Sequence, residues 1–289
     1  MKAVLHITSG DCAGAVLARS GIAGEILVWH DMLYLCARAP GWPDDATLDA
    51  RARFLEDLTG GGLSRKTIRA TLDAQYAQLA TAGQYERIVL WFDACLFDQA
   101  MLAHILACMT TEALARTDVL CVDAFPGIEP YHGLGQLQPQ QMASVYHRRC
   151  PLSAAQAVYA RVADAAFASQ DPERLATLAA GRDTPLPWLP AAAARWLQEQ
   201  PDPVTGLGRL ATLALDAIRA GCEKPADIFA AVSAADTPPQ YWGDITLWAT
   251  INALAHRTPP LVRIDGPAPR LPQWEGGAEL ASFRITCAP

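Results

Sequence analysis

The sequence predicts an α/β protein, with a parallel-sheet N-terminal domain over residues 1–137 and an all-helical region over residues 138–289 that ends in a winged-helix-like module. Two observations predict this class. Short apolar runs alternate with helical patterns in the first half, and strand signals stop near residue 138. Strands return only in the tail, which begins at about residue 204.

The first half contains four strand signals, each a short run of apolar and strand-forming residues. They lie at residues 3–8, 25–30, 87–92 and 118–122. Between them we predict a helix over 12–20, two helices of which the second begins at Ser64, and a helix over 96–113. Strands that are apolar throughout and alternate with helices are typical of a parallel sheet covered on both faces.

The second half is dominated by helical patterns. They recur near residues 138–146, 153–168, 171–180 and 187–199, and again near 206–220, 224–234 and 240–257. Two short strands, at 261–264 and 281–286, then flank a loop rich in proline and glycine. Three helices followed by two strands are the outline of a winged helix.

Composition excludes several classes of protein. Of the 289 residues, 51% are hydrophobic and 18% are charged, so the chain can bury a core and is not disordered. No apolar run reaches the roughly 18 residues that a membrane-spanning helix needs, and the first residues show no signal-peptide pattern. Eight cysteines without Cys-x-x-Cys spacing indicate reduced thiols and a cytoplasmic protein.

The net charge of −7 is shared evenly between the two halves, so neither has the basic excess of a nucleic-acid-binding protein. The pattern at 240–257, which would be the recognition helix, contains Arg257 as its one basic residue. We therefore expect no nucleic-acid partner. The module should instead pack against the α/β domain or against a second subunit in a homo-oligomer, with Trp242 and Trp248 as buried anchors.

Ligands of open parallel sheets bind beyond the carboxyl ends of the strands. Each of the four strand ends supplies a carboxylate: Asp11, Asp31, Asp93 and Asp123. Asp98 and Gln99 lie close by, near the start of the next helix. The residues expected to bind a ligand are Ser9, Gly10, Asp11, Asp31, Asp93, Asp98 and Gln99.

Two interpretations of these carboxylates stay open. Gathered carboxylates repel one another unless they are protonated, hydrogen-bonded or bridged by a cation, and a Mg²⁺ ion held by Asp11, Asp31 and Asp93 would relieve that repulsion. Alternatively, each aspartate caps the helix that follows it, which suits Asp11 and Asp93. Asp31 and Asp123 do not clearly begin helices, which favours a shared site for the whole set.

Two other features suggest an anion site only weakly. Gly10 would let the backbone approach a phosphate at a helix N-terminus, but the Gly-x-Gly-x-x-Gly fingerprint and the phosphate-loop motif are both missing. Arg65, Lys66 and Arg69 crowd the first turn of another helix, where the helix dipole disfavours cations. Such a cluster is either an anion site or a solvated surface.

Three sequence blocks carry a resemblance to a known family: Leu-His-Ile-Thr-Ser-Gly-Asp, Ile-Leu-Val-Trp-His-Asp-Met-Leu and Val-Leu-Trp-Phe-Asp-Ala-Cys-Leu-Phe-Asp-Gln. They resemble the signature blocks of an uncharacterised bacterial family, domain-of-unknown-function 1835, and the tail resembles its helical companion domain. The resemblance implies no established activity. Its motif positions here are Gly10, Asp11, Trp29, Asp31, Asp98 and Gln99. The family carries His-Asp after the acidic residue of the third block, so this chain lacks a carboxylate at Cys95.

Three hypotheses follow. The leading one is that the sheet edge binds a small, phosphate-bearing or nucleotide-like ligand, with the helical tail shaping or covering the site. The second is a metal-dependent phosphohydrolase or phosphotransferase. The third is a regulatory or scaffold protein that acts through the winged-helix-like tail.

Overall fold

The computed structural model describes residues 2–274 and 279–288, which form two compact units. Unit 1 comprises Met1–Arg51 and Arg69–Leu197, and unit 2 comprises Ala52–Ile68 and Gln198–Pro289. The main division therefore falls near Leu197, whereas the sequence suggested residue 137. The physical reason is that β5 (Cys150–Pro151) pairs with β4 and α7 (Ala154–Ser169) packs on α4, which keeps this segment in unit 1.

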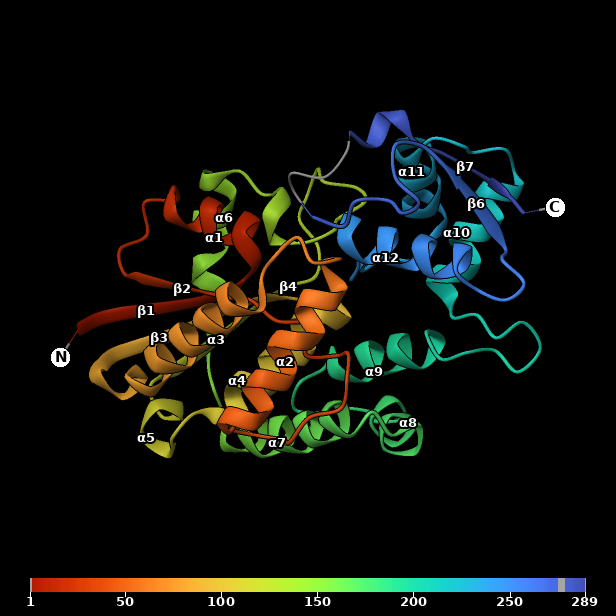
Figure 1. The fold of residues 1–289 in the computed structure, drawn as a ribbon. Coiled ribbons are helices and arrows are strands. Elements are labelled where there is room, and N and C mark those ends of the chain that lie inside the picture. Colours follow the sequence, from red (N-terminus) through yellow and green to blue (C-terminus); the bar gives the residue numbers. More distant parts are fainter. Residues whose placement is uncertain (1, 275–278, 289) are drawn as a thin grey trace. The chain divides into compact units, whose positions relative to one another are not determined.

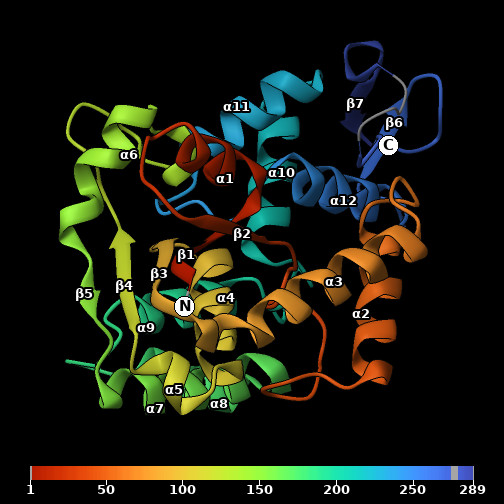
Figure 2. The ribbon, with the colours of Figure 1, turned by 90° about the vertical axis from the view of Figure 1, so that its left-hand side faces the viewer.

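Unit 1 is built on a five-stranded sheet in the order β2-β1-β3-β4-β5 (Figures 1 and 2). The strands β1 (Lys2–Ser9), β2 (Glu25–Trp29), β3 (Tyr85–Asp93) and β4 (Thr117–Val122) are parallel, and β5 is antiparallel to β4. A mainly parallel sheet is thus confirmed. Its central strands are buried at nearly every position, which explains why they are apolar throughout.

Helices cover both faces of this sheet. On one face α1 (Gly10–Ala18), α6 (Pro139–Val145) and the short 3-10 turn η2 (Leu134–Gln136) bury Val89 and Trp91 of β3. On the other face lies α4 (Leu96–Cys108), which is backed by α7; Figure 1 shows the two helix layers on opposite sides. The remaining helices with residues in unit 1 are α2 (Asp45–Leu58), α3 (Arg65–Ala80), α5 (Thr111–Leu114), α8 (Pro172–Ala179) and α9 (Leu189–Gln198).

Helix boundaries differ from the sequence expectation in one informative place. The helix predicted over residues 96–113 stops at Cys108 and restarts at Thr111. Thr110 has extended backbone, and its hydroxyl accepts a hydrogen bond from the Ala113 N–H at 3.3 Å. It is therefore an N-cap that starts α5, and this side-chain cap interrupts an apolar pattern that would otherwise continue.

Unit 2 contains the three helices and the two-stranded hairpin that the sequence of the tail predicts. They are α10 (Arg209–Arg219), α11 (Pro225–Ala235), α12 (Asp244–Ala255), β6 (Val262–Asp265) and β7 (Arg284–Cys287). The expected strand at 281–286 begins later, because residues 280–282 form the 3-10 turn η4 (Leu280–Ser282). Part of the expected proline- and glycine-rich loop, residues 275–278, lies outside the described residues.

Two tryptophans predicted as anchors are buried, and their ring contacts lie inside unit 2. Trp242 and Trp248 both contact the ring of Phe229 on α11. The Trp242 indole N–H also donates to Asp236 at 2.8 Å. In the part of the chain that the structure describes, each helix is too short or too polar to cross a lipid bilayer.

Candidate functional site

The edge where β1 and β3 end is the topological switch point of the sheet. From β1 the chain passes through α1 to β2 on one side, and it later returns to β3 on the other side of β1. Connections that diverge from neighbouring strand ends leave a crevice between them, and open α/β sheets bind their ligands there. Ser9 and Asp93, the last residues of β1 and β3, lie at this edge.

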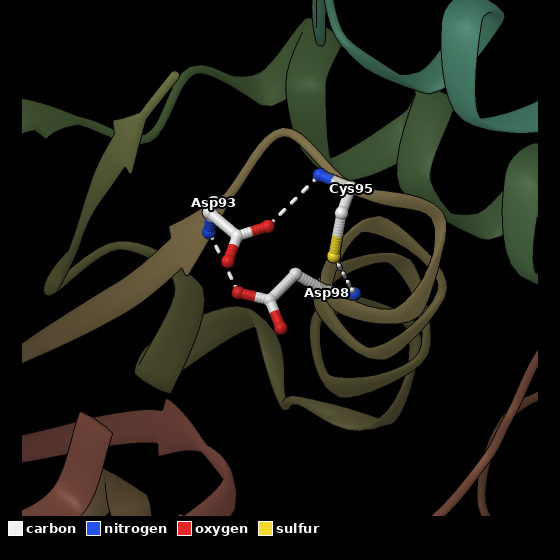
Figure 3. Close-up of side chains that lie close together, drawn as sticks. All are labelled: Asp93, Cys95 and Asp98. Carbon is white, nitrogen blue, oxygen red and sulfur yellow. Dashed lines mark hydrogen bonds between the residues drawn. The ribbon is translucent and has the colours of Figure 1, made fainter. Parts of the chain in front are cut away.

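Three side chains gather immediately after β3, as Figure 3 shows: Asp93, Cys95 and Asp98. Cys95 is the N-cap of α4, and its sulfur accepts from the Asp98 N–H at 3.5 Å. The Asp93 carboxylate accepts from the Cys95 N–H at 2.9 Å, and the Asp98 carboxylate reaches back to the Asp93 N–H at 2.6 Å. These reciprocal bonds satisfy backbone donors at the strand–helix junction, as a capping box does.

Two other sequence-predicted residues complete this group. Ser9 is close enough to Asp98 to lower the pKa of that carboxyl, and the Gln99 amide donates to the Asp93 carbonyl at 2.6 Å. The four side chains come from three parts of the junction: Ser9 from the end of β1, Asp93 from the end of β3, and Asp98 and Gln99 from the first turn of α4. The structure therefore brings together four of the seven predicted residues, Ser9, Asp93, Asp98 and Gln99.

The two carboxyl groups are buried side by side. Asp93 is 7% exposed and Asp98 is 2% exposed. Burial raises the pKa of Asp93 to about 6, and burial together with the negative charge of Asp93 raises the pKa of Asp98 well above its usual range. Burial also raises the pKa of the Cys95 thiol. Near neutral pH the pair therefore holds a proton unless a cation neutralises it.

A segment from much later in the chain covers this group. Burial, followed by the charges of Asp93 and Asp98, raises the pKa of Tyr131. The Leu134 backbone N–H lowers the pKa of Asp93. Gly133, at φ +141°, leaves no room for a side chain, because a Cβ there would overlap the Asp93 carboxylate. Glycine is required here by both backbone conformation and space.

The expected cation site at Asp11, Asp31 and Asp93 is not assembled. The Asp11 side chain is 84% exposed and pairs with the His30 ring at 2.9 Å. Asp31 is buried, but both of its carboxylate oxygens accept from the guanidinium of Arg51. The guanidinium of Arg51 thus supplies the positive charge that a Mg²⁺ ion was expected to supply at Asp31. The residues that lie with Asp93 are instead Cys95 and Asp98.

Sequence reasoning missed a second buried polar network, on the other face of the sheet. Asp164 accepts from Arg38 at 2.5 Å, lies 3.0 Å from the His104 Nδ1 and accepts from the Gly41 N–H at 2.7 Å. The Tyr76 hydroxyl lies 2.6 Å from the other nitrogen of His104. A signal for it did exist, because Asp164 and His104 are single polar residues on otherwise apolar faces of α7 and α4.

In this second network the direction of each hydrogen bond to the His104 ring is fixed. Burial lowers the pKa of His104, so the ring is neutral at pH 7, donates to Asp164 and accepts from Tyr76. Burial raises the pKa of Asp164, but the hydrogen bond from His104 and the charge of Arg38 outweigh that effect and lower it to about 2. The side chains of Asp164, His104, Tyr76 and Arg38 are buried, and the network fastens the loop after β2 to α4 and α7. We interpret it as structural.

A hollow of about 530 Å³ opens beside the loop that follows β4. Among its lining residues are His132, Gln136, Gln138 and Gln141. Gln136 adjoins Gly135, whose backbone packs closely on Cys12 in the first turn of α1. The hollow therefore lies next to the start of α1, and its volume is within the range of small-molecule sites.

Comparisons with protein-family models and with curated proteins found no match to this chain, so its function is argued from the geometry of the site.

We expect Gly133→Ala to destabilise unit 1 more than Gly127→Ala. Both glycines have positive φ, so each substitution strains the backbone at a cost of about 1–2 kcal/mol. A Cβ at Gly127 meets no other atom within 4 Å, whereas one at Gly133 overlaps Asp93 and adds about 1–3 kcal/mol. Urea unfolding measures both variants. Equal losses would contradict the close packing over Asp93.

We expect acid to weaken unit 1 through His104. Its pKa is lowered in the folded state, so the unfolded chain binds a proton that the folded chain excludes, and stability falls as the pH drops below 6.5. Asp164 adds a further loss as the pH falls from about 4 toward 2. Urea unfolding between pH 7.5 and 5 should show a shallower pH dependence for His104→Gln than for the wild type.

His147→Gln, at an exposed histidine, serves as the control and should keep the wild-type pH dependence. The comparison with wild type is necessary because the raised pKa of Asp93 acts in the opposite direction, making the folded state less stable as the pH rises toward 6. A His104→Gln profile parallel to that of the wild type would contradict the neutral buried ring.

Proposed function

We propose that unit 1 binds a small, phosphate-bearing or nucleotide-like ligand at the edge between β1 and β3. The observation that carries this proposal is the start of α1. Ser9 is its N-cap, yet the Ser9 side chain makes no capping hydrogen bond. The backbone N–H groups of the first turn are thus left without a side-chain cap, and a helix N-terminus in that condition favours an anion.

Gly10 supports the same placement. It has φ +65°, and a Cβ built on it meets no atom within 4 Å, so its side of the helix start is open. A phosphate there would approach the backbone directly. His30, which pairs with Asp11 at the rim, offers a hydrogen-bond donor, and the hollow lined by His132 and Gln136 would take the remainder of the ligand. His132 keeps a buried ring nitrogen with no partner.

A second candidate is metal-dependent phosphoester hydrolysis or phosphoryl transfer. The observation that favours it is the buried group of Asp93, Cys95 and Asp98, which lies on the same edge. In that case Asp93 and Asp98 hold the cation, because Asp31 is already neutralised by Arg51 and Asp11 is exposed. The cation would supply Lewis acidity to a phosphate bound at the start of α1.

The other expectations from the sequence stay proposals. A winged-helix-like role for unit 2 is supported by the order of its elements, but α12 contains no lysine or arginine, which disfavours contact with a DNA backbone. Eight free cysteines support a reducing, cytoplasmic setting. Homo-oligomerisation and membership of the domain-of-unknown-function 1835 family remain predictions from the sequence.

We expect Gly10→Asp to abolish ligand binding and Gly10→Asn to preserve most of it. The two side chains have the same shape and impose the same backbone strain, but only aspartate places a negative charge on the first turn of α1. Calorimetry with nucleoside mono-, di- and triphosphates should show at least a tenfold weaker affinity for the aspartate variant than for the asparagine variant. The matched pair Gly21→Asp and Gly21→Asn, at the far end of α1, should bind equally.

Equal affinities of the two Gly10 variants would contradict an anion at this helix start. Wild-type protein that binds none of the nucleotides and no inorganic phosphate, as judged by calorimetry and thermal unfolding, would contradict the proposed function as a whole.

A further inference from the structure

The buried aspartates of this protein fall into two classes. Six aspartates are buried among the described residues, and four of them form an ion pair with an arginine: Asp31 with Arg51, Asp118 with Arg87, Asp164 with Arg38 and Asp236 with Arg209. In the described structure Asp93 and Asp98 have no such partner. A buried carboxylate without a positive neighbour is costly, and here two of them are adjacent.

The pocket around these two carboxyl groups is rich in acceptors. Gln99 is fully buried, and its amide must present its nitrogen to the Asp93 carbonyl, which can only accept. The Gln99 carbonyl oxygen is therefore fixed as an acceptor, and it has no partner among the described residues. The buried Tyr131 hydroxyl is also unpartnered. The Gln99 carbonyl oxygen and the Tyr131 hydroxyl are therefore the two buried groups here that a bound cation would supply with a partner.

We propose that Asp93, Cys95 and Asp98, with the Gln99 carbonyl beside them, bind a divalent transition-metal ion of the Zn²⁺ or Co²⁺ class. The three ligand atoms lie within 4.8 Å of one another. A tetrahedral ion with bonds of about 2.0–2.3 Å holds its ligands about 3.3–3.8 Å apart, so small side-chain rotations close the site. The thiol sulfur disfavours Mg²⁺, which takes oxygen ligands in octahedral geometry.

Binding exchanges protons for the metal. The proton of the Cys95 thiol and the proton shared by Asp93 and Asp98 are released to solvent, and coordinate bonds form from one thiolate and two carboxylates to the ion. The resulting site carries less net charge than three anions alone. This inference deepens the proposed function, because the ion lies at the edge where the phosphate would bind, but it is tested with metal alone.

The test is a titration with Co²⁺, which reports a thiolate ligand by a charge-transfer absorption. The parent protein is the full chain with its four exposed cysteines replaced by serine: Cys12, Cys36, Cys150 and Cys287. After treatment with a chelator, it should bind one Co²⁺ with that absorption. Zn²⁺ should displace the Co²⁺, and excess Mg²⁺ should not.

Matched variants assign the site. Cys95→Ser should lose the charge-transfer absorption, and Asp98→Asn should weaken Co²⁺ binding at least tenfold. Cys121→Ser removes a buried thiol 3.6 Å from the Gln99 amide but outside the group, and Asp123→Asn removes an exposed carboxylate at the end of β4. Both controls should bind like the parent.

The parent protein decides the question even if the variants fold poorly. Absence of a saturable, one-to-one Co²⁺ absorption in the folded parent overturns the metal site, as does an absorption that persists in Cys95→Ser. Nucleotide binding without Co²⁺ binding would overturn this inference and leave the proposed function standing. Co²⁺ binding without nucleotide binding would overturn the proposed function and leave this inference standing.

Discussion

Burying a carboxylate in a protein interior requires a compensating charge or proton, and this requirement organises unit 1. On the face of the sheet that carries α4, arginine side chains supply the compensating charge. Arg51 holds Asp31 and also donates to the carbonyls of Met32 and Leu35, while Arg38 and His104 hold Asp164. These pairs fasten the irregular segment after β2 to the helices around it. The charges there hold that segment in place.

The junction of β3 and α4 meets the same requirement differently. The Cys95 N–H donates to the Asp93 carboxylate, and Ser9 lowers the pKa of Asp98, but among the described residues neither carboxylate forms an ion pair with a lysine or arginine. The junction lies where the connections of a 2-1-3-4-5 sheet diverge, beside the uncapped start of α1. Topology places the start of α1 and the buried acidic group at one edge of the sheet. A cation in the pocket would offset the repulsion between the acids and a bound phosphate.

Much of this arrangement was predictable from the sequence, because it depends on local pattern and on one topological rule. Apolar runs located the four parallel strands, and the rule that ligands bind at strand ends selected Ser9, Asp93, Asp98 and Gln99. The partners of the acids were not predictable. Arg51 lies 20 residues beyond Asp31, and nothing in its local pattern distinguishes it from an exposed arginine. Cys95, which looked like a lost ligand, proved to be the N-cap that holds its neighbours together.

Anomalous X-ray diffraction from crystals grown with Zn²⁺ tests the central claim most directly. A two-wavelength difference map across the zinc absorption edge should show one peak between Asp93, Cys95 and Asp98, with the Asp31 pair unchanged. A map without a peak there, in which the Asp93 and Asp98 carboxyl groups are joined by a short hydrogen bond, would contradict the claim. That result would mean that the Asp93 and Asp98 carboxyl groups share a proton and serve only to cap the start of α4.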